Sequence, residues 1–253
     1  MQNLRKKANN ATKERILTAA KEEFAEFGFD GARMGSIAKR ADANQALLHY
    51  YFDSKDKLYD EVIKNYFSVD DEKIIRDAVA QWDLTRQQEL YMGIYLLVRF
   101  PLGALGKELS RILTREVAEG SEHLEKIMGE YILPKLISFQ NVIKTGIEEG
   151  VFETHNLRMV VMQLLVFIIS YENLKSFSPS LDGKNKIPLF NLMFGDTVEN
   201  DLFKFLLDHT FKGLTPVGQV VTIPEFKKER LEFLDKLIND LGKMRLAALR
   251  EDS

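Results

Sequence analysis

Apolar residues recur at helical spacing along almost the whole chain of 253 residues, and no stretch alternates as a strand would. The first long stretch shows the pattern clearly, because Ile16, Ala20, Phe24 and Phe27 fall on one helical face. Helices with such faces bury their apolar side chains by packing on one another. The sequence therefore predicts an all-α fold.

The first helix is expected to run from Thr12, whose hydroxyl can cap it, to Phe27, where Gly28 ends it. The residues before it, 1–11, hold Arg5, Lys6 and Lys7 and no acidic residue, so we expect a basic N-terminal arm. No apolar run of the kind found in secretory signals follows this arm. We therefore expect that the arm is not a secretory signal.

Two short helices follow, and their spacing is typical of DNA-binding proteins. The first is expected from Met34 to Ala41, and the second begins after Asn44, a good cap, and ends near Tyr51. A further helix starts at Asp53 or Ser54 and continues to residue 66. Two short helices braced by a longer one on each side predict a helix-turn-helix at about 34–53.

The second short helix is the expected recognition helix, with Leu48 and Phe52 facing the core. Gln45 is then free to pair with adenine, while small apolar residues beside it contact a thymine methyl. Basic and hydroxyl groups at the flanks are expected to meet phosphates. The residues expected to bind DNA are Arg33, Asn44, Gln45, Ala46, Leu47, His49, Tyr50 and Lys55.

A spaced set of residues in this region resembles the DNA-binding domain of the TetR family of bacterial regulators. The resemblance covers about residues 12–66 and lies in Gly28-Phe29, Ile37-Ala38, Ala41, Leu48, Phe52, Ser54-Lys55 and Leu58. It implies a homodimer with an N-terminal three-helix DNA-binding domain, 12–66. It also implies a larger helical domain, 67–253, for binding a small-molecule effector and for dimerisation.

The chain departs from the family pattern in its turn and at two helix starts. The turn reads Asp42-Ala43-Asn44 where the family has Gly-Val before Ser or Thr, and Asp tolerates the left-handed backbone that such a turn needs. Arg33 stands where a hydroxyl residue usually opens the second helix, and Ala46 replaces a glycine. The family's frequent Tyr-x-His is here His49-Tyr50-Tyr51.

The remainder of the chain predicts further helices, with Gly and Pro as punctuation. The expected ranges are 71–82, 86–99, 105–119, 122–149, 156–175, 189–194, 197–213 and 224–250. The helices near 156–175 and 197–213 resemble in order the pair through which the family dimerises. Their apolar residues suit either that interface or ordinary core. The last helix, 224–250, is an extra amphipathic element whose role the sequence does not give.

An effector cavity in the larger domain would be lined by methionine and aromatic side chains, which also fill ordinary cores. The residues expected to line it are Tyr91, Tyr95, Phe100, Met128, Tyr131, Phe139, Met162 and Phe167. We interpret the chain as a dimeric repressor that an apolar small molecule releases from a palindromic operator. The sequence does not identify the operator, the regulated genes, the effector or the sign of regulation.

Two alternative functions stay open at this point. A helical DNA-binding or interaction protein without an effector has the same pattern. A metal-dependent enzyme would use Glu119 and His123, four apart on one helical face, but no phosphate-binding loop, HExxH or nucleophile elbow accompanies them. We therefore expect no catalytic activity, no cofactor and no metal.

Composition sets the cellular context. The chain has no cysteine, which suits a reducing cytoplasm. Its most apolar stretch, 160–171, is shorter than the roughly 18 residues a membrane span needs. The sequence therefore predicts a cytoplasmic protein whose macromolecular partners are double-stranded DNA and a second copy of itself.

Overall fold

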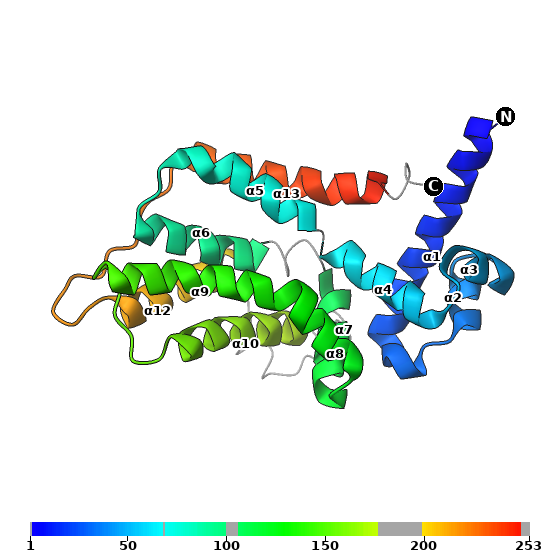
Figure 1. Cartoon of the computed structure of the whole chain (residues 1–253), viewed down its shortest axis with the longest axis horizontal. Helices are drawn as coiled ribbons and strands as arrows, with labels where there is room; N and C mark the ends of the chain where they lie inside the picture. Colours follow the sequence, from blue (N-terminus) through cyan, green and yellow to red (C-terminus); the bar gives the residue numbers. More distant parts are fainter. Residues whose placement is uncertain (1, 68, 100–105, 177–198, 249–253) are drawn as a thin grey trace, which may run out of the picture. The chain divides into compact units, whose positions relative to one another are not determined.

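The computed structural model describes residues 2–67, 69–99, 106–176 and 199–248, and within these ranges all the regular elements are helices (Figure 1). The predicted all-α fold is confirmed. The chain divides into two compact units. The first contains 1–78, 104–127 and 232–253, and the second contains 79–103 and 128–231.

The first helix is longer than the sequence predicted. Helix α1 spans Gln2–Gly31, so Thr12 lies inside it and does not cap its start, and the described residues of the predicted arm continue this helix. The predicted end is confirmed, because Gly28 leaves the helix with φ 71°, a left-handed value that favours glycine. The position of Thr12 inside the helix was missed, although the residues before it carry no strong stop signal.

The helix-turn-helix is present as predicted. Helix α2 is Met34–Arg40, α3 is Gln45–Phe52 and α4 is Lys55–Tyr66. Asp42 in the turn has φ 48°, the left-handed conformation that aspartate tolerates. Ser54 caps α4 by accepting a hydrogen bond from the Lys57 amide.

The core of the first unit joins these four helices to α7. Helix α1 packs against α2, α4 and α7, and α3 packs against α2 and α4 (Figure 1). Ile16, Phe24, Ile37, Leu48 and Leu58 are fully buried in this core. Burial on this scale is what holds such short helices in place, since helices of 7 and 8 residues are marginal alone.

The rest of the first unit comes from distant parts of the chain. It contains α5 (Val69–Val79), α7 (Gly106–Glu119), α8 (Glu122–Ile127) and all but the first turn of α13 (Lys228–Ala248). The amphipathic face predicted for the last helix is confirmed, because its Leu234, Ile238 and Leu241 are buried. The helix-turn-helix therefore belongs to a unit larger than residues 12–66.

The second unit is a helical bundle. It contains η1 (Ala80–Trp82), α6 (Arg86–Val98), a π-helical segment η3 (Met128–Ile132), α9 (Leu133–Glu148), α10 (Leu157–Ser176) and α12 (Glu199–Leu214). Helix α9 packs against α6 and α10, and α6 packs against α12. Gly93 permits the close approach of α6 and α9, since a Cβ there would lie 2.7 Å from the Phe139 ring.

Two predicted helices differ from the structure. The helix expected at 122–149 is interrupted by the π-helical segment, and the last helix begins at Lys228 because residues 216–227 are not helical. The helix expected at 189–194 falls outside the described residues.

Candidate nucleic-acid interface

Helix α3 presents the face that the sequence assigned to DNA. Its side chains Leu48 and Phe52 are buried, which fixes the rotation of the helix. On the opposite face Gln45, Ala46 and His49 are exposed, and Tyr50 is exposed by 75%. Leu47 is half-buried at the edge of this face. One short helix thus offers an amide, small apolar groups and two ring side chains together.

Asn44 positions this helix. Its side-chain oxygen accepts a hydrogen bond from the Leu47 amide at 2.8 Å, which satisfies one of the free amides of the first turn. The predicted cap is confirmed. The Asn44 side-chain oxygen is therefore occupied within the protein, and its amide nitrogen is the group left to meet a phosphate.

The His49 ring is oriented by the backbone. Its Nδ1 lies 2.9 Å from the carbonyl oxygen of Asp53, and a carbonyl can only accept, so Nδ1 carries the proton. Nε2 is then the ring nitrogen that faces away from this contact. His49 is therefore expected to contact DNA through Nε2 and not through Nδ1.

A charged pair closes the C-terminal end of α3. Lys57 Nζ lies 2.7 Å from the Asp53 carboxylate, and this hydrogen bond holds the pKa of Asp53 below its usual range. Both side chains are largely exposed, so the pair contributes little to stability. Next to it the rings of Tyr50 and Tyr51 meet edge to face at 5.2 Å. Burial raises the pKa of Tyr51, which keeps its hydroxyl protonated.

Lys55 is engaged in a way that the sequence did not reveal. Its ammonium donates to the carbonyl oxygens of Phe29 at 2.9 Å, Ala32 at 3.4 Å and Asp30 at 3.5 Å, which follow Gly28 near the end of α1. It also lies 4.4 Å from the centre of the Phe29 ring. A cation among carbonyl groups at a helix end is a favourable C-terminal cap. Lys55 therefore holds α4 against the end of α1, whatever it contacts in a DNA complex.

We expect Lys55→Met to lower the stability of the first unit by about 1–2 kcal/mol, because three carbonyl groups lose a charged donor. Unfolding in urea measures this. If the ammonium also contacts phosphate, the same variant lowers the salt slope of DNA binding by roughly one. Lys39→Met, an exposed lysine on α2, is the matched control for stability. Unchanged stability of Lys55→Met would contradict the capping role.

Arg33 and Arg40 flank α2 and differ in their contacts. Arg33 is exposed at the N-terminal end of the helix, where its side chain makes no cap, so it is available to a phosphate. Arg40 at the other end is tied to α1, with Nε 2.9 Å from the Glu23 carboxylate and Nη2 2.5 Å from that of Glu26. The Glu26 hydrogen bond raises the pKa of Arg40. Arg40 thus positions α2 instead of joining the predicted DNA contacts.

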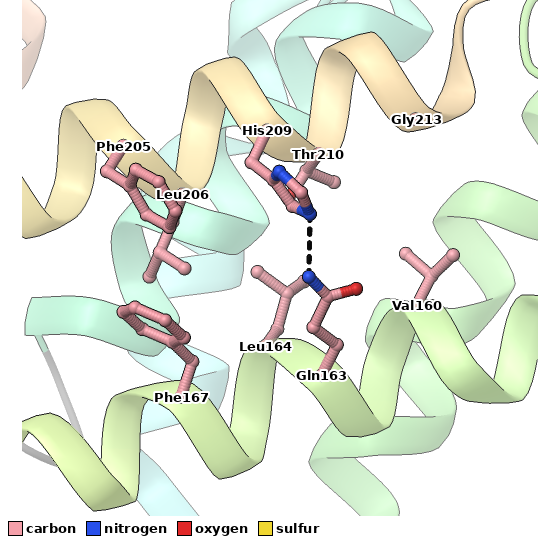
Figure 2. A pocket seen from close by; sticks show the side chains of 9 residues that line it. All are labelled: Val160, Gln163, Leu164, Phe167, Phe205, Leu206, His209, Thr210 and Gly213. Atoms are coloured by element: carbon pink, nitrogen blue, oxygen red, sulfur yellow. Dashed lines mark hydrogen bonds between the residues drawn. The ribbon is translucent and has the colours of Figure 1, made fainter.

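A second exposed surface lies on the bundle unit, along α10 and α12. Met159, Met162, Val166 and Phe167 on α10 are each more than 40% exposed, as is Phe205 on α12. A shallow pocket lies between the two helices, and the stacked rings of Phe167 and Phe205, 5.2 Å apart, form one end of it (Figure 2).

The middle of this pocket is polar. Gln163 and His209 face each other across it, joined by a hydrogen bond of 2.6 Å (Figure 2). These two residues were not among the predicted ones. The signal that could have identified them is a polar residue at a helical position flanked by apolar ones on both predicted dimer helices.

The predicted effector-binding residues do not form one cluster. Tyr91 and Tyr95 meet around Phe203, with ring centres 5.3 Å from it in both cases, and Phe226 lies 4.7 Å from Tyr91. Phe139 is buried beside Gly93, and Met128 and Tyr131 are half-buried on η3. Met162 and Phe167 point outward on α10, while Phe100 lies outside the described residues. Periodicity could not show which apolar face of α10 points inward, because this helix is apolar on several sides.

Glu119 and His123 were considered as a metal site, but in the structure the His123 ring packs against aromatic rings. The His123 ring packs 4.1 Å from the Phe29 ring and 4.8 Å from the Tyr59 ring. Across the described ranges no group of three or more His, Cys, Asp or Glu side chains is arranged to hold a metal ion. Among those same residues no helix has the length and apolar character needed to cross a bilayer.

Part of this chain matches a known protein family. Residues 16–62 match the family model described as "Bacterial regulatory proteins, tetR family". The chain is similar to the HTH-type transcriptional regulator RutR of Escherichia coli K12, with 27% identity over 202 residues that cover 78% of this chain and 89% of RutR.

Two solved structures share the fold. A linker-substituted mutant of HlyIIR has a TM-score of 0.56 and 24% identity, covering 81% of this chain and 97% of that one. The transcriptional regulator FadR of Bacillus subtilis, solved in complex with stearoyl-CoA, has a TM-score of 0.51 and 19% identity, covering 76% and 96%. At this identity the structural likeness shows the fold alone.

Proposed function

The chain belongs to the TetR family of bacterial transcriptional regulators, and on that premise we propose that it is a dimeric repressor whose operator affinity falls when an apolar effector binds. The observation that carries the proposal is the face of α3. Leu48 and Phe52 fix its rotation, so Gln45, Ala46 and His49 face outward at the start of a helix-turn-helix. The relatives are regulators, and nothing favours the enzyme alternative.

We propose that the exposed face of α3 enters the major groove. Gln45 reads adenine, while Ala46 and Leu47 contact a thymine methyl group. Asn44, His49 and Tyr50 lie at the flanks, where phosphates pass. Arg33 and Lys55 are the basic members of the set, at the starts of α2 and α4.

Gln45→Ala is expected to weaken operator binding by about 1–3 kcal/mol and to relax the preference at one base pair in each half-site, because a bidentate amide contact is lost. Binding to a set of single-base operator variants measures it. Tyr50→Phe is the comparison, since loss of a phosphate contact weakens binding to all sequences alike. If Gln45→Ala loses equal affinity for specific and random DNA, Gln45 does not read a base.

We propose that two copies associate through α10 and α12. The apolar side chains exposed there are too many and too close together for a surface that faces water in the working protein. A two-fold axis would bring the same patch of each subunit into contact, so that the Phe167–Phe205 stacks and the Gln163–His209 bonds become buried. A dimer also supplies the two recognition helices that a palindromic operator needs.

The effector site is proposed in the bundle unit. Its aromatic residues Tyr91, Tyr95 and Phe203 suit a ligand with an apolar body, and burial raises the pKa of Tyr91, which stays a hydrogen-bond donor. FadR, which shares the fold, holds an acyl-CoA. Met128, Tyr131 and Phe139 are further proposed lining residues, and the protein is proposed to act in the cytoplasm.

The test is to recover and sequence the genomic DNA bound by the full chain. The proposal expects a two-fold sequence with half-site centres about one helical turn or a multiple of it apart. Recovery of DNA without any shared sequence would contradict the specific-regulator function. Candidate apolar compounds are then tested for release of that DNA.

A further inference from the structure

One buried carboxylate in the first unit is not used by the DNA-binding face. The Glu116 side chain on α7 is 1% exposed. One of its oxygens accepts a hydrogen bond from the Tyr59 hydroxyl on α4 at 2.5 Å. The other accepts from the Ser121 hydroxyl, in the turn that leads into α8. A single acid therefore joins α4, α7 and the start of α8.

The donor from α4 is held in place by rings. Tyr59 is buried between Phe24, at 4.9 Å, and Phe29, at 5.2 Å, both from α1. The His123 ring of α8 also contacts Tyr59, with ring centres 4.8 Å apart. Burial, and then the hydrogen bond to Glu116, raises the pKa of Tyr59 well above its usual range. The hydroxyl thus remains a donor at neutral pH.

Other contacts run between the same elements. Arg115 Nη2 donates to the Glu26 carbonyl oxygen of α1 at 2.6 Å, and Lys126 on α8 pairs with Asp60 on α4 at 2.6 Å. These side chains are exposed, so their contribution is small and sensitive to salt. The buried Glu116 bonds are screened much less, and leaving the carboxylate without a donor would be costly.

We infer that Glu116 is a positioning residue for DNA binding: through Tyr59 and Ser121 it fixes α4 to α7 and α8, and so sets where the recognition helix is held in the dimer. The inference rests on the proposed function, since it matters only if two recognition helices bind one operator. It adds the residues through which a displacement of α7 would reach α3.

The directionality of hydrogen bonds explains why Glu116 can fix the relative positions of α4, α7 and the turn at Ser121 more closely than apolar packing alone. The hydrophobic effect has no preferred direction, whereas a hydroxyl that moves an ångström away from a carboxylate oxygen loses its hydrogen bond. Glu116 has two donors on different elements, so only one arrangement of α4, α7 and the turn at Ser121 satisfies both. A buried polar group of this kind specifies geometry more than it adds stability.

The test uses the full chain and DNA selected by the wild-type protein from a random pool. The two half-sites of that DNA are then moved apart and together one base pair at a time, and affinity is measured at each spacing. Tyr59→Phe removes the hydroxyl and keeps the ring. We expect it to lose about tenfold affinity at the preferred spacing and less than that at the others, so that the spacing preference broadens.

Controls separate positioning from stability. Glu119→Gln removes one negative charge from the same helix without touching the Tyr59 bond, and it should keep the wild-type spacing profile. Ser121→Ala removes the second donor and should broaden the profile as Tyr59→Phe does. A loss that is equal at every spacing, or an unchanged profile, would overturn the inference. Failure of the wild-type protein to select any two-fold DNA would instead refute the proposed function.

Discussion

A chain carrying both Phe167→Glu and Phe205→Glu is expected to be monomeric at micromolar concentration and to lose about 100-fold or more of its affinity for a two-fold operator. The two rings stack on each other at the exposed surface of α10 and α12. In the proposed dimer they are covered, and four added carboxylates would be buried close together near the two-fold axis. Burying unpaired like charges costs more than the interface can supply.

The loss of DNA affinity follows from the loss of the dimer. Each recognition helix alone binds one half-site, and the second half-site of a dimer binds at high effective concentration. Sedimentation measures the association, and titration of a two-fold and a single half-site measures the binding. Affinity for the single half-site should stay close to that of the wild-type protein.

A matched control is available on α9. Leu133 and Ile137 are 49% and 47% exposed and lie one turn apart on a single helix of the same unit. Leu133→Glu with Ile137→Glu adds the same charge to a comparable surface. If this control dissociates the protein and the α10/α12 variant does not, the dimer forms through α9 and the proposed interface is wrong.

Leu48→Ala is expected to cost about 2–5 kcal/mol of the free energy of unfolding, because it leaves a cavity where a fully buried side chain was. Helix α3 has 8 residues and is held by this side chain and Phe52, so operator binding should fall with stability. Thermal and urea unfolding measure the first effect, and DNA titration at low temperature measures the second.

Leu47→Ala is the control for Leu48→Ala, because it makes the same change one residue earlier, on a different face of α3. Leu47 is half-buried at the edge of the DNA-facing surface. Its variant should keep most of the stability and lose affinity at positions where a thymine methyl is read. Equal losses of stability for Leu47→Ala and Leu48→Ala would show that α3 is rotated differently from the structure described above.

Helices were predictable where the local sequence shows both an apolar periodicity of helical spacing and residues that begin or end a helix. The end of α1 at Gly28, the Asn44 cap and the buried positions of α3 depend on interactions within a few residues. The π-helical segment at Met128–Ile132 was not predictable, because a local change of hydrogen-bond partner leaves the apolar spacing nearly unchanged. The start of α1 was missed because Thr12 can cap a helix but also fits inside one.

The surroundings of the proposed DNA-contacting residues were predictable only where their partners are near in sequence. Gln45 and His49 follow from the rotation of α3, which Leu48 fixes. Lys55 was expected to contact a phosphate. In the free protein its partners are carbonyl groups near the end of α1, more than twenty residues away in sequence. The sequence placed Glu116 only beside the possible metal pair Glu119 and His123, because its contact with Tyr59 joins residues 57 positions apart in the chain.

That long separation has a consequence for how relatives of this chain can diverge. Recombination that exchanges the first 66 residues between two family members would keep α1 to α4 together but would pair Tyr59 with a foreign α7. The hybrid would bury a hydroxyl or a carboxylate without its counterpart, and selection would act against it. If Glu116 positions the recognition helix as inferred above, substitutions at positions 59, 116 and 121 are expected to occur together in relatives of this chain.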